Sequence, residues 1–200
     1  MKLLAFTDFH ASIVALRKVR ENILRHKPDL AVCCGDLTVF EQNIVPVMRV
    51  LGAIPVKLLL IHGNHEQPHV VARLAKKYKN IVWLHKRTYR VGDVLFVGYG
   101  GQGFVRRDLE FERFMRSIDT DVRKAGRVVL VTHQPPFKTK LDRLYWSYVG
   151  NESFSNSIKK HKNIVLALSG HIHETFGKKD KLGNALVLNP GPFGTIVSLP

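Results

Sequence analysis

Five apolar segments of the sequence each run directly into side chains that can bind a metal ion or transfer a proton. These side chains are carboxylates, one amide and imidazoles: Asp8, His10, Asp36, Asn64, His65, His133, His171 and His173. In open α/β sheets, ligands bind at the C-terminal ends of the strands, where such side chains would gather. A single apolar segment ending this way would carry little information. Five of them predict one convergent site.

The chemistry of this set points to divalent metal ions. Oxygen and imidazole ligands without thiolates suit manganese, iron, zinc, cobalt or nickel. Apart from His65, the set offers seven ligand groups, too many for one open catalytic ion, and a carboxylate such as Asp36 can bridge two ions about 3.5–4 Å apart. We therefore expect two divalent cations, manganese first, with iron, zinc, nickel or cobalt as alternatives. Taken singly, His10 or His133 could instead be an ordinary buried histidine.

The first half of the chain predicts parallel strands joined by helices. Ser12 is a candidate N-cap for a helix over 12–25, in which apolar residues recur at helical spacing. The helix joins apolar segments 2–7 and 30–34 into a βαβ unit, which implies a parallel pair. A second helix over 43–51 leads to a third parallel strand at 56–61.

The second half predicts another, mixed sheet that faces the first. A helix over 67–78 and a strand at 81–84 come before it. Shorter links then join further expected strands, at 87–90, 94–99, 128–132, 164–169, 185–188 and 195–199. Two helices accompany them, near 108–124 and from an N-cap at Ser153 to 160. We expect an α/β fold of two sheets flanked by helices, in a single domain over 1–200.

Composition and length indicate an ordinary globular chain. The 200 residues are 45% hydrophobic and 24% charged, and no segment approaches the ~20 apolar residues that a membrane span needs. The sequence starts with a strand-like segment, which leaves no room for a signal peptide, so we expect a cytoplasmic protein without membrane contact. Cys33 and Cys34 are adjacent in an expected strand and are interpreted as small apolar residues.

The net charge of +15 is large for a chain of this size. It favours phosphate substrates or polyanionic partners, including nucleic acid, through long-range attraction. The simpler alternative is a solvated, lysine-rich surface, because charge runs usually face water.

The order Asp-x-His, Gly-Asp, Gly-Asn-His-Glu, His, Gly-His-x-His resembles the calcineurin-like metallophosphoesterase superfamily. The resemblance runs from Asp8 to the turn at 189–192 and implies a four-layer α/β/β/α sandwich of two mixed sheets. It also implies two metal positions, one held by Asp8, His10, Asp36 and His173 and the other by Asp36, Asn64, His133 and His171. His65 would be the non-ligand histidine that donates a proton to the leaving oxygen. The implied reaction is attack of metal-bound hydroxide on phosphorus without a covalent enzyme intermediate.

Departures from particular subfamilies narrow this expectation. No arginine follows Gly35-Asp36 at the position typical of protein Ser/Thr phosphatases of the superfamily. The sequence looks more like small prokaryotic phosphoesterases related to cyclic-nucleotide phosphodiesterases. We expect hydrolysis of phosphodiesters or phosphomonoesters, nucleotides among them. The alternatives are a nuclease, and a non-catalytic scaffold of the same fold, whose expected mark would be loss of His65 or of several ligands.

Two further segments are candidates for the walls of the site. The glycine-rich stretch 98–103 satisfies G-x-G-x-x-G, but residues 104–107 separate it from any helix, so a loop is favoured over dinucleotide binding. Arg106 or Arg107 could then reach a substrate phosphate. The aperiodic segment 134–150 contains Lys138 and several aromatic residues that could hold a phosphate and stack a base. The alternative for its aromatic residues is packing on the core or on a second subunit, as in a homodimer.

Overall fold

The first of two mixed sheets carries the N-terminal half of the chain. The computed structural model describes residues 1–101 and 103–199. The strands of this sheet are β1 (Lys2–Phe6), β2 (Leu30–Cys33), β3 (Leu58–Leu60), β4 (Ile81–Trp83) and β13 (Thr195–Ser198). They lie in the order β13-β1-β2-β3-β4. As predicted, β1, β2 and β3 are parallel, with Leu3 opposite Leu30 and Ala31 opposite Leu58. The strand expected at 195–199 was wrongly assigned to the second sheet, because β13 joins the first sheet, antiparallel to β1.

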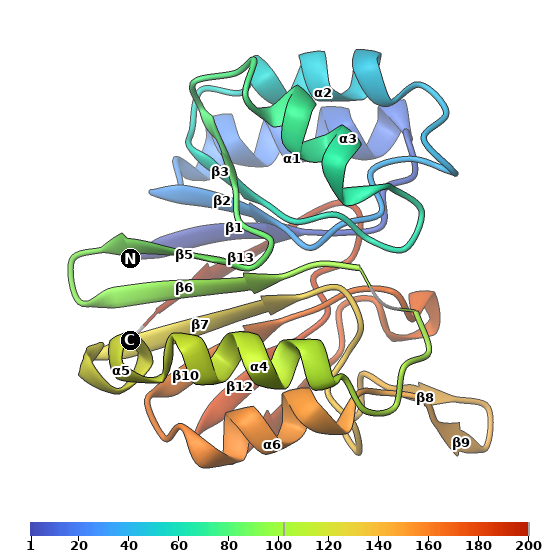
Figure 1. Cartoon of the computed structure of the whole chain (residues 1–200). Helices are drawn as coiled ribbons and strands as arrows, with labels where there is room; N and C mark the ends of the chain where they lie inside the picture. The colour runs from blue at the N-terminus through green and yellow to red at the C-terminus, as the bar shows by residue number, and fades with distance from the viewer. Residues whose placement is uncertain (102, 200) are drawn as a thin grey trace.

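Three helices cover the outer face of this sheet (Figure 1). They are α1 (Ile13–His26), α2 (Ile44–Gly52) and α3 (Pro68–Ala75). The predicted cap of α1 is confirmed, because the Ser12 side chain accepts a hydrogen bond from the Ala15 backbone N–H at 3.2 Å. None of the helices that the structure describes is both long and apolar enough to cross a bilayer.

The second sheet faces the first and is also mixed. Its strands are β5 (Arg87–Val91), β6 (Val94–Tyr99), β7 (Arg127–Thr132), β10 (Ile164–Leu168), β11 (Lys179–Leu182) and β12 (Ala185–Leu188). They lie in the order β11-β12-β10-β7-β6-β5, with the inner four parallel and both edge strands antiparallel. The helices α4 (Leu109–Ser117), α5 (Asp119–Lys124) and α6 (Glu152–Lys160) lie on its outer side (Figure 1).

Three apolar layers hold these four layers of secondary structure together. Side chains alternate between the two faces of a strand, so Leu4 and Phe6 of β1 pack under α1 to α3, whereas Leu3 and Ala5 pack between the sheets. A third cluster, which includes Phe154 of α6, fills the space between the second sheet and its helices. The expected α/β/β/α sandwich is therefore confirmed.

The structure corrects the expected helix over 108–124, which is two helices separated at Ile118. The residues around the break are poor helix formers, and Asp119 and Asp121 stabilise the first turn of a new helix through its dipole. The predicted cap of α6 was also wrong. Asn151 is the N-cap, and its side chain accepts from the Phe154 N–H, whereas the Ser153 hydroxyl donates to Glu112.

Short elements were also missed where the sequence predicted no strand or helix. The segment 134–150 contains a separate hairpin of β8 (Arg143–Leu144) and β9 (Ser147–Tyr148), and β11 forms an edge of the second sheet. A single 3₁₀ turn, η1 (His173–Thr175), follows β10. Both β8 and β9 are too short to show an alternating pattern in sequence.

Candidate metal centre

The predicted site residues lie where strands of both sheets end. Asp8 follows β1, Asp36 follows β2, and Asn64 follows β3 in the first sheet. His133 follows β7 and His171 follows β10 in the second sheet. Parallel strands end at a common edge, so both sheets deliver polar side chains to one region.

Several of these residues have a backbone conformation that L-residues seldom adopt. The φ angles are +50° for Asp8, +43° for His10, +50° for Asp36 and +70° for His171. Non-glycine residues in this region are strained and tend to gather at functional sites. The strand ends thus turn sharply, and the turns direct the side chains into the site.

Glycines allow the turns to approach one another closely. A Cβ on Gly35 would overlap the backbone of Gly63, and a Cβ on Gly63 would overlap the Asp36 carboxylate. On the other sheet, a Cβ on Gly170 would overlap the carboxylate of Asp8. The two carboxylates can therefore occupy their positions only because these neighbours lack side chains.

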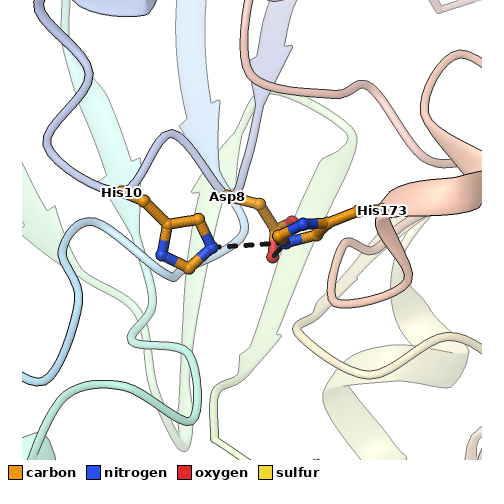
Figure 2. A group of neighbouring side chains, drawn as sticks. All are labelled: Asp8, His10 and His173. Carbon is orange, nitrogen blue, oxygen red and sulfur yellow. Dashed lines mark hydrogen bonds and ion pairs between the residues drawn. The ribbon is translucent and has the colours of Figure 1, made fainter.

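One group of candidate ligands consists of Asp8, His10 and His173, whose ligand atoms lie within 4.8 Å of one another. Figure 2 shows the three side chains pointing toward one another. The Nε2 atoms of His10 and His173 are 3.2 Å apart, and His173 Nε2 is 3.5 Å from Asp8 Oδ1. Asp8 is buried and also accepts hydrogen bonds from the Thr7 hydroxyl and the His171 N–H.

Asp36 lies at the centre of the remaining candidates. Its Oδ2 atom is 3.4 Å from His133 Nε2, and 3.8 Å from both His10 Nε2 and His65 Nε2. Asp36 belongs to two further groups that could hold an ion, one with His10 and His65 and one with His133 and His171. Asn64 Oδ1 lies 2.9 Å from His133 Nε2. The shared carboxylate is in the position that a bridging ligand would need.

Hydrogen bonds outside the cluster orient two of the imidazoles. His10 Nδ1 donates to the Thr38 carbonyl at 3.0 Å, and His133 Nδ1 donates to the Cys34 carbonyl at 2.8 Å. A carbonyl can only accept, so Nδ1 carries the proton and the Nε2 lone pair faces the site in the neutral ring. Metal-binding histidines are commonly held in this way.

The electrostatics of the cluster couple its acids to its imidazoles. Burial alone would raise the pKa of Asp36, but the positive charge of His133 and hydrogen bonds from His133 and the His65 N–H lower it to about 2. Burial would lower the pKa of His133, but Asp36 raises it to about 9. Burial, with the charge of His133, lowers the pKa of His171 to about 4. The hydrogen bond to Asp8 raises the pKa of His173.

The arrangement fits metal ions. The His171 Nε2 atom is buried and has no hydrogen-bond partner among the residues that the structure describes, which is costly unless another group satisfies it. Ligand atoms about 2.1 Å from one ion lie roughly 3.0–3.4 Å apart at octahedral or tetrahedral angles. The separations of 3.2 Å (His10–His173) and 3.4 Å (Asp36–His133) match these edges.

His65 differs from His10 and His133 in its hydrogen bonding. Its Nδ1 atom accepts from the Phe40 N–H at 3.4 Å, and its ring packs against the Phe40 ring. The proton of the neutral His65 ring is therefore on Nε2, which faces the Asp36 carboxylate. His65 thus presents a donor where His10 and His133 present lone pairs.

Glu66 is a buried site residue to which the sequence interpretation gave no role. Its carboxylate accepts from the Thr38 N–H at 2.9 Å and the Gly63 N–H at 3.0 Å, so it joins the turns after β2 and β3. Burial raises its pKa, as does the charge of Asp36. The Thr38 carbonyl in turn accepts the hydrogen bond from His10 Nδ1. The Gly-Asn-His-Glu motif draws attention to Glu66, but the motif alone does not show that this glutamate binds the backbone of Thr38.

The three basic residues predicted to bind substrate occupy more peripheral positions. Arg106 pairs with Glu152 at 2.8 Å and stacks on the Phe137 ring, and Arg107 pairs with Glu112 at 3.0 Å. Lys138 lies near the ring of Phe137. Their role toward a substrate stays a prediction. Gln102, in the glycine-rich stretch, is outside the described residues.

The fold and the cluster together define a class of protein. Two mixed sheets between helices, with carboxylates and imidazoles at the shared strand ends, are the features of a metal-dependent phosphoesterase. The sequence profile of the calcineurin-like phosphoesterase family matches residues 1–175. The chain therefore belongs to this family.

Individual relatives agree with this assignment. The uncharacterized protein MJ1162 of Methanocaldococcus jannaschii is 28% identical, over 96% of this chain and 88% of that protein. The crystal structure of TT1561 of Thermus thermophilus has a TM-score of 0.77 at 17% identity and covers 96% of this chain and 89% of that one. A dimetal phosphatase from Danio rerio has a TM-score of 0.63 at 15% identity, over 94% and 86% of the two chains. These structural likenesses concern the fold.

Proposed function

We propose that this protein hydrolyses phosphodiesters or phosphomonoesters with the help of two divalent metal ions. The observation that carries the proposal is the set of three overlapping His and carboxylate groups, two of which share Asp36. Asp8, His10, Asp36 and His173 would hold one ion, and Asp36, Asn64, His133 and His171 the other. The oxygen and imidazole donors suit manganese, with iron, zinc, nickel or cobalt as alternatives.

The ions, when bound, would supply an activated water as nucleophile and positive charge for the phosphoryl oxygens. The chain's own residues keep the ligands in place. Cys34 and Thr38 hold His133 and His10 with their Nε2 atoms toward the site. Glu66 fixes the two turns that carry Asp36 and Asn64.

His65 is the proposed proton donor to the leaving oxygen. Its Nδ1 atom accepts the Phe40 N–H, so the proton available to a substrate is on Nε2. Donation from this atom would stabilise the alkoxide that leaves as the phosphorus–oxygen bond breaks. The presence of His65 and of all seven predicted ligands favours a hydrolase over a scaffold without turnover.

The experiment compares a bis-aryl phosphodiester with an aryl phosphomonoester. The protein is stripped of metal and reloaded with manganese, and Asp36→Ala is tested beside Asp93→Ala, whose exposed carboxylate pairs with Arg127. We expect manganese-dependent turnover that Asp36→Ala abolishes and Asp93→Ala retains, and the preferred ester identifies the reaction. Absence of turnover with manganese, iron, zinc, nickel and cobalt would favour the scaffold.

A further inference from the structure

An exposed hairpin beside the candidate metal centre presents two aromatic side chains to solvent. We call β8, β9 and their tip, residues 143–148, the aromatic hairpin. It projects from the four layers of the molecule (Figure 1). At its tip, Tyr145 is 82% exposed and Trp146 is 92% exposed. Aromatic side chains usually bury most of their surface, so this pair is available to a partner.

The backbone of the tip is strained. Tyr145 has a φ angle of +52°, in the region where tight hairpin turns normally use glycine or asparagine. A bulky residue there is disfavoured. Tyr145 thus combines a disfavoured backbone conformation with a side chain that is largely exposed to solvent. Such strain is typical of segments that serve binding.

A cavity lies between the aromatic hairpin and Phe104, a neighbour of the metal centre. The cavity has a volume of about 270 Å³ and is lined by Phe104, Arg106, Tyr148 and Val149. Phe104 reaches the centre itself, because its ring lies 4.7 Å from the ring of His171, centroid to centroid. The cavity therefore lies between Tyr148 of the hairpin and Phe104, which contacts the candidate ligand His171.

The chain segment that contains the hairpin is basic. The segment 137–148 contains Lys138, Lys140 and Arg143 but only one acidic residue, Asp142. Asp142 is buried and accepts hydrogen bonds from backbone N–H groups, Lys138 and Gly150 among them. It is therefore turned away from a ligand. The exposed side of the segment offers cations interleaved with aromatic rings.

We propose that the aromatic hairpin stacks the unpaired bases of a single-stranded nucleic acid whose phosphodiester reaches the metal centre along the cavity. The inference rests on the proposed function and specifies its substrate class. Alternating rings and cations match a strand that alternates bases and phosphates. Stacking at the tip needs free base faces, which a duplex does not offer. The net charge of +15 attracts a polyanion and opposes a second copy of the chain.

The test measures binding to metal-stripped protein, so that it does not depend on hydrolysis. The probe is a fluorescently labelled oligothymidylate, followed by anisotropy. Trp146→Ala is expected to weaken binding about 5- to 150-fold, the range found when one stacking aromatic is removed, and Trp146→Phe to recover most of it. Phe193→Ala is the control, because Phe193 is also exposed but lies beside α1. It should bind like the unaltered protein.

Tryptophan fluorescence gives a second readout. The chain has two tryptophans, so Trp83→Phe leaves Trp146 as the only one. Stacking should quench its emission on addition of oligothymidylate, whereas the Trp146→Phe protein, with Trp83 alone, should show no quenching. If Lys138 contacts a phosphate, Lys138→Gln should lower the slope of log affinity against log salt by about 0.7.

Two results would overturn the inference. One is an unchanged affinity of Trp146→Ala for oligothymidylate. The other is concentration-dependent dimerisation that Trp146→Ala removes, which would assign the hairpin to self-association. The aryl ester assay separates this inference from the proposed function. Ester turnover without oligonucleotide binding would reject only the proposed role of the hairpin. Trp146-dependent binding without ester turnover would reject only the proposed phosphoesterase activity.

Discussion

At the scale of single residues, the imidazoles of the site are distinguished by the position of the ring proton. His10 and His133 donate from Nδ1 to backbone carbonyls, so in the neutral ring the lone pair is at Nε2. His65 accepts at Nδ1 and keeps the proton at Nε2. This difference divides candidate ligands from a candidate acid even though all three Nε2 atoms lie within 3.8 Å of Asp36 Oδ2.

His65→Gln should lower kcat by about 100- to 10,000-fold on an ester with a poor leaving group, because general acid catalysis contributes by that order. Metal content, measured by atomic emission, should not change. His69→Gln is the control, since His69 is exposed at the start of α3. A His65→Gln protein that loses its metal would instead identify His65 as a ligand.

The buried imidazole of His85 should make the stability of the protein depend on pH. Its Nδ1 atom accepts the Gly100 N–H at 2.9 Å, and its ring packs against His62. Burial first, and then the charge of Lys86, lower its pKa to about 4 from an ordinary value of 6.5. The unfolded chain therefore binds the proton more readily than the folded one. The stability that the neutral His85 ring contributes is fully present above about pH 6.5 and is lost as pH falls toward 4.

Chemical denaturation between pH 7 and pH 4 measures this dependence. His85→Gln keeps an acceptor for Gly100 but cannot be protonated, so its free energy of unfolding should fall less steeply than that of the unaltered protein. A residual slope should remain, because burial also lowers the pKa of His62, to about 3. If the free energy of unfolding of His85→Gln falls with pH as steeply as that of the unaltered protein, His85 does not cause the pH dependence.

At the scale of elements, the close approach of the turns after β2 and β3 determines the position of Asp36. Gly63→Ala would introduce a methyl group into the space of the Asp36 carboxylate. We expect a loss of about 1–3 kcal/mol of stability, as for other overpacking substitutions, together with weaker metal retention. Thermal unfolding and metal analysis after dialysis measure the two effects.

Gly92→Ala is the matched control for this substitution. No atom lies within 4 Å of a Cβ at Gly92, although its φ of +58° is unfavourable for alanine. It should cost about 1–2 kcal/mol through the backbone alone, with metal retention unchanged. Equal metal loss in both variants would mean that general destabilisation, and not displacement of Asp36, is responsible.

Elements whose signals are local were predictable, and those that depend on partners were not. The strands of the sandwich centre are continuous apolar runs, and Ser12 caps its helix within three residues, so both could be read from the sequence. The break at Ile118 depends only on the weak helix preferences of the residues around it. From its position in the sequence, Ser153 was a suitable N-cap for α6. In the fold, Asn151 caps this helix, and the Ser153 hydroxyl donates a hydrogen bond to Glu112 instead.

The same distinction applies to the site. Asp8, Asp36 and His133 each follow an apolar strand, so their convergence was predictable from the fold alone. The ion pairs of Arg106 and Arg107 are made with α6 and α4, and the bridging role of Glu66 joins residues 28 positions apart. Such partners are determined by packing, which residue spacing does not encode.

At the scale of the whole molecule, the candidate ligands come from both sheets, so bound ions would link the two halves of the sandwich. Manganese at 100 times its Kd should stabilise the protein by about 2.7 kcal/mol, which corresponds to a rise in Tm of roughly 5–10 °C for a chain of this length. Differential scanning fluorimetry measures the shift. A chelator should reverse it, and Asp36→Ala should show none. A shift that Asp36→Ala retains would place metal binding elsewhere.

The antiparallel strand β13 has a consequence for the order of events during synthesis. Lys2 of β1 pairs with Ser198 of β13, so β1 completes its pairing in the sheet only after β13 has been synthesised. A nascent chain that has completed β3 already displays Asp8, Asp36 and Asn64, but His171 and His173 are still untranslated. Such a partial chain would hold ions weakly, because three of the seven predicted ligands, His133, His171 and His173, are missing. Acquisition of metal would therefore follow the synthesis of β10 and of the turn after it, which carries His171 and His173.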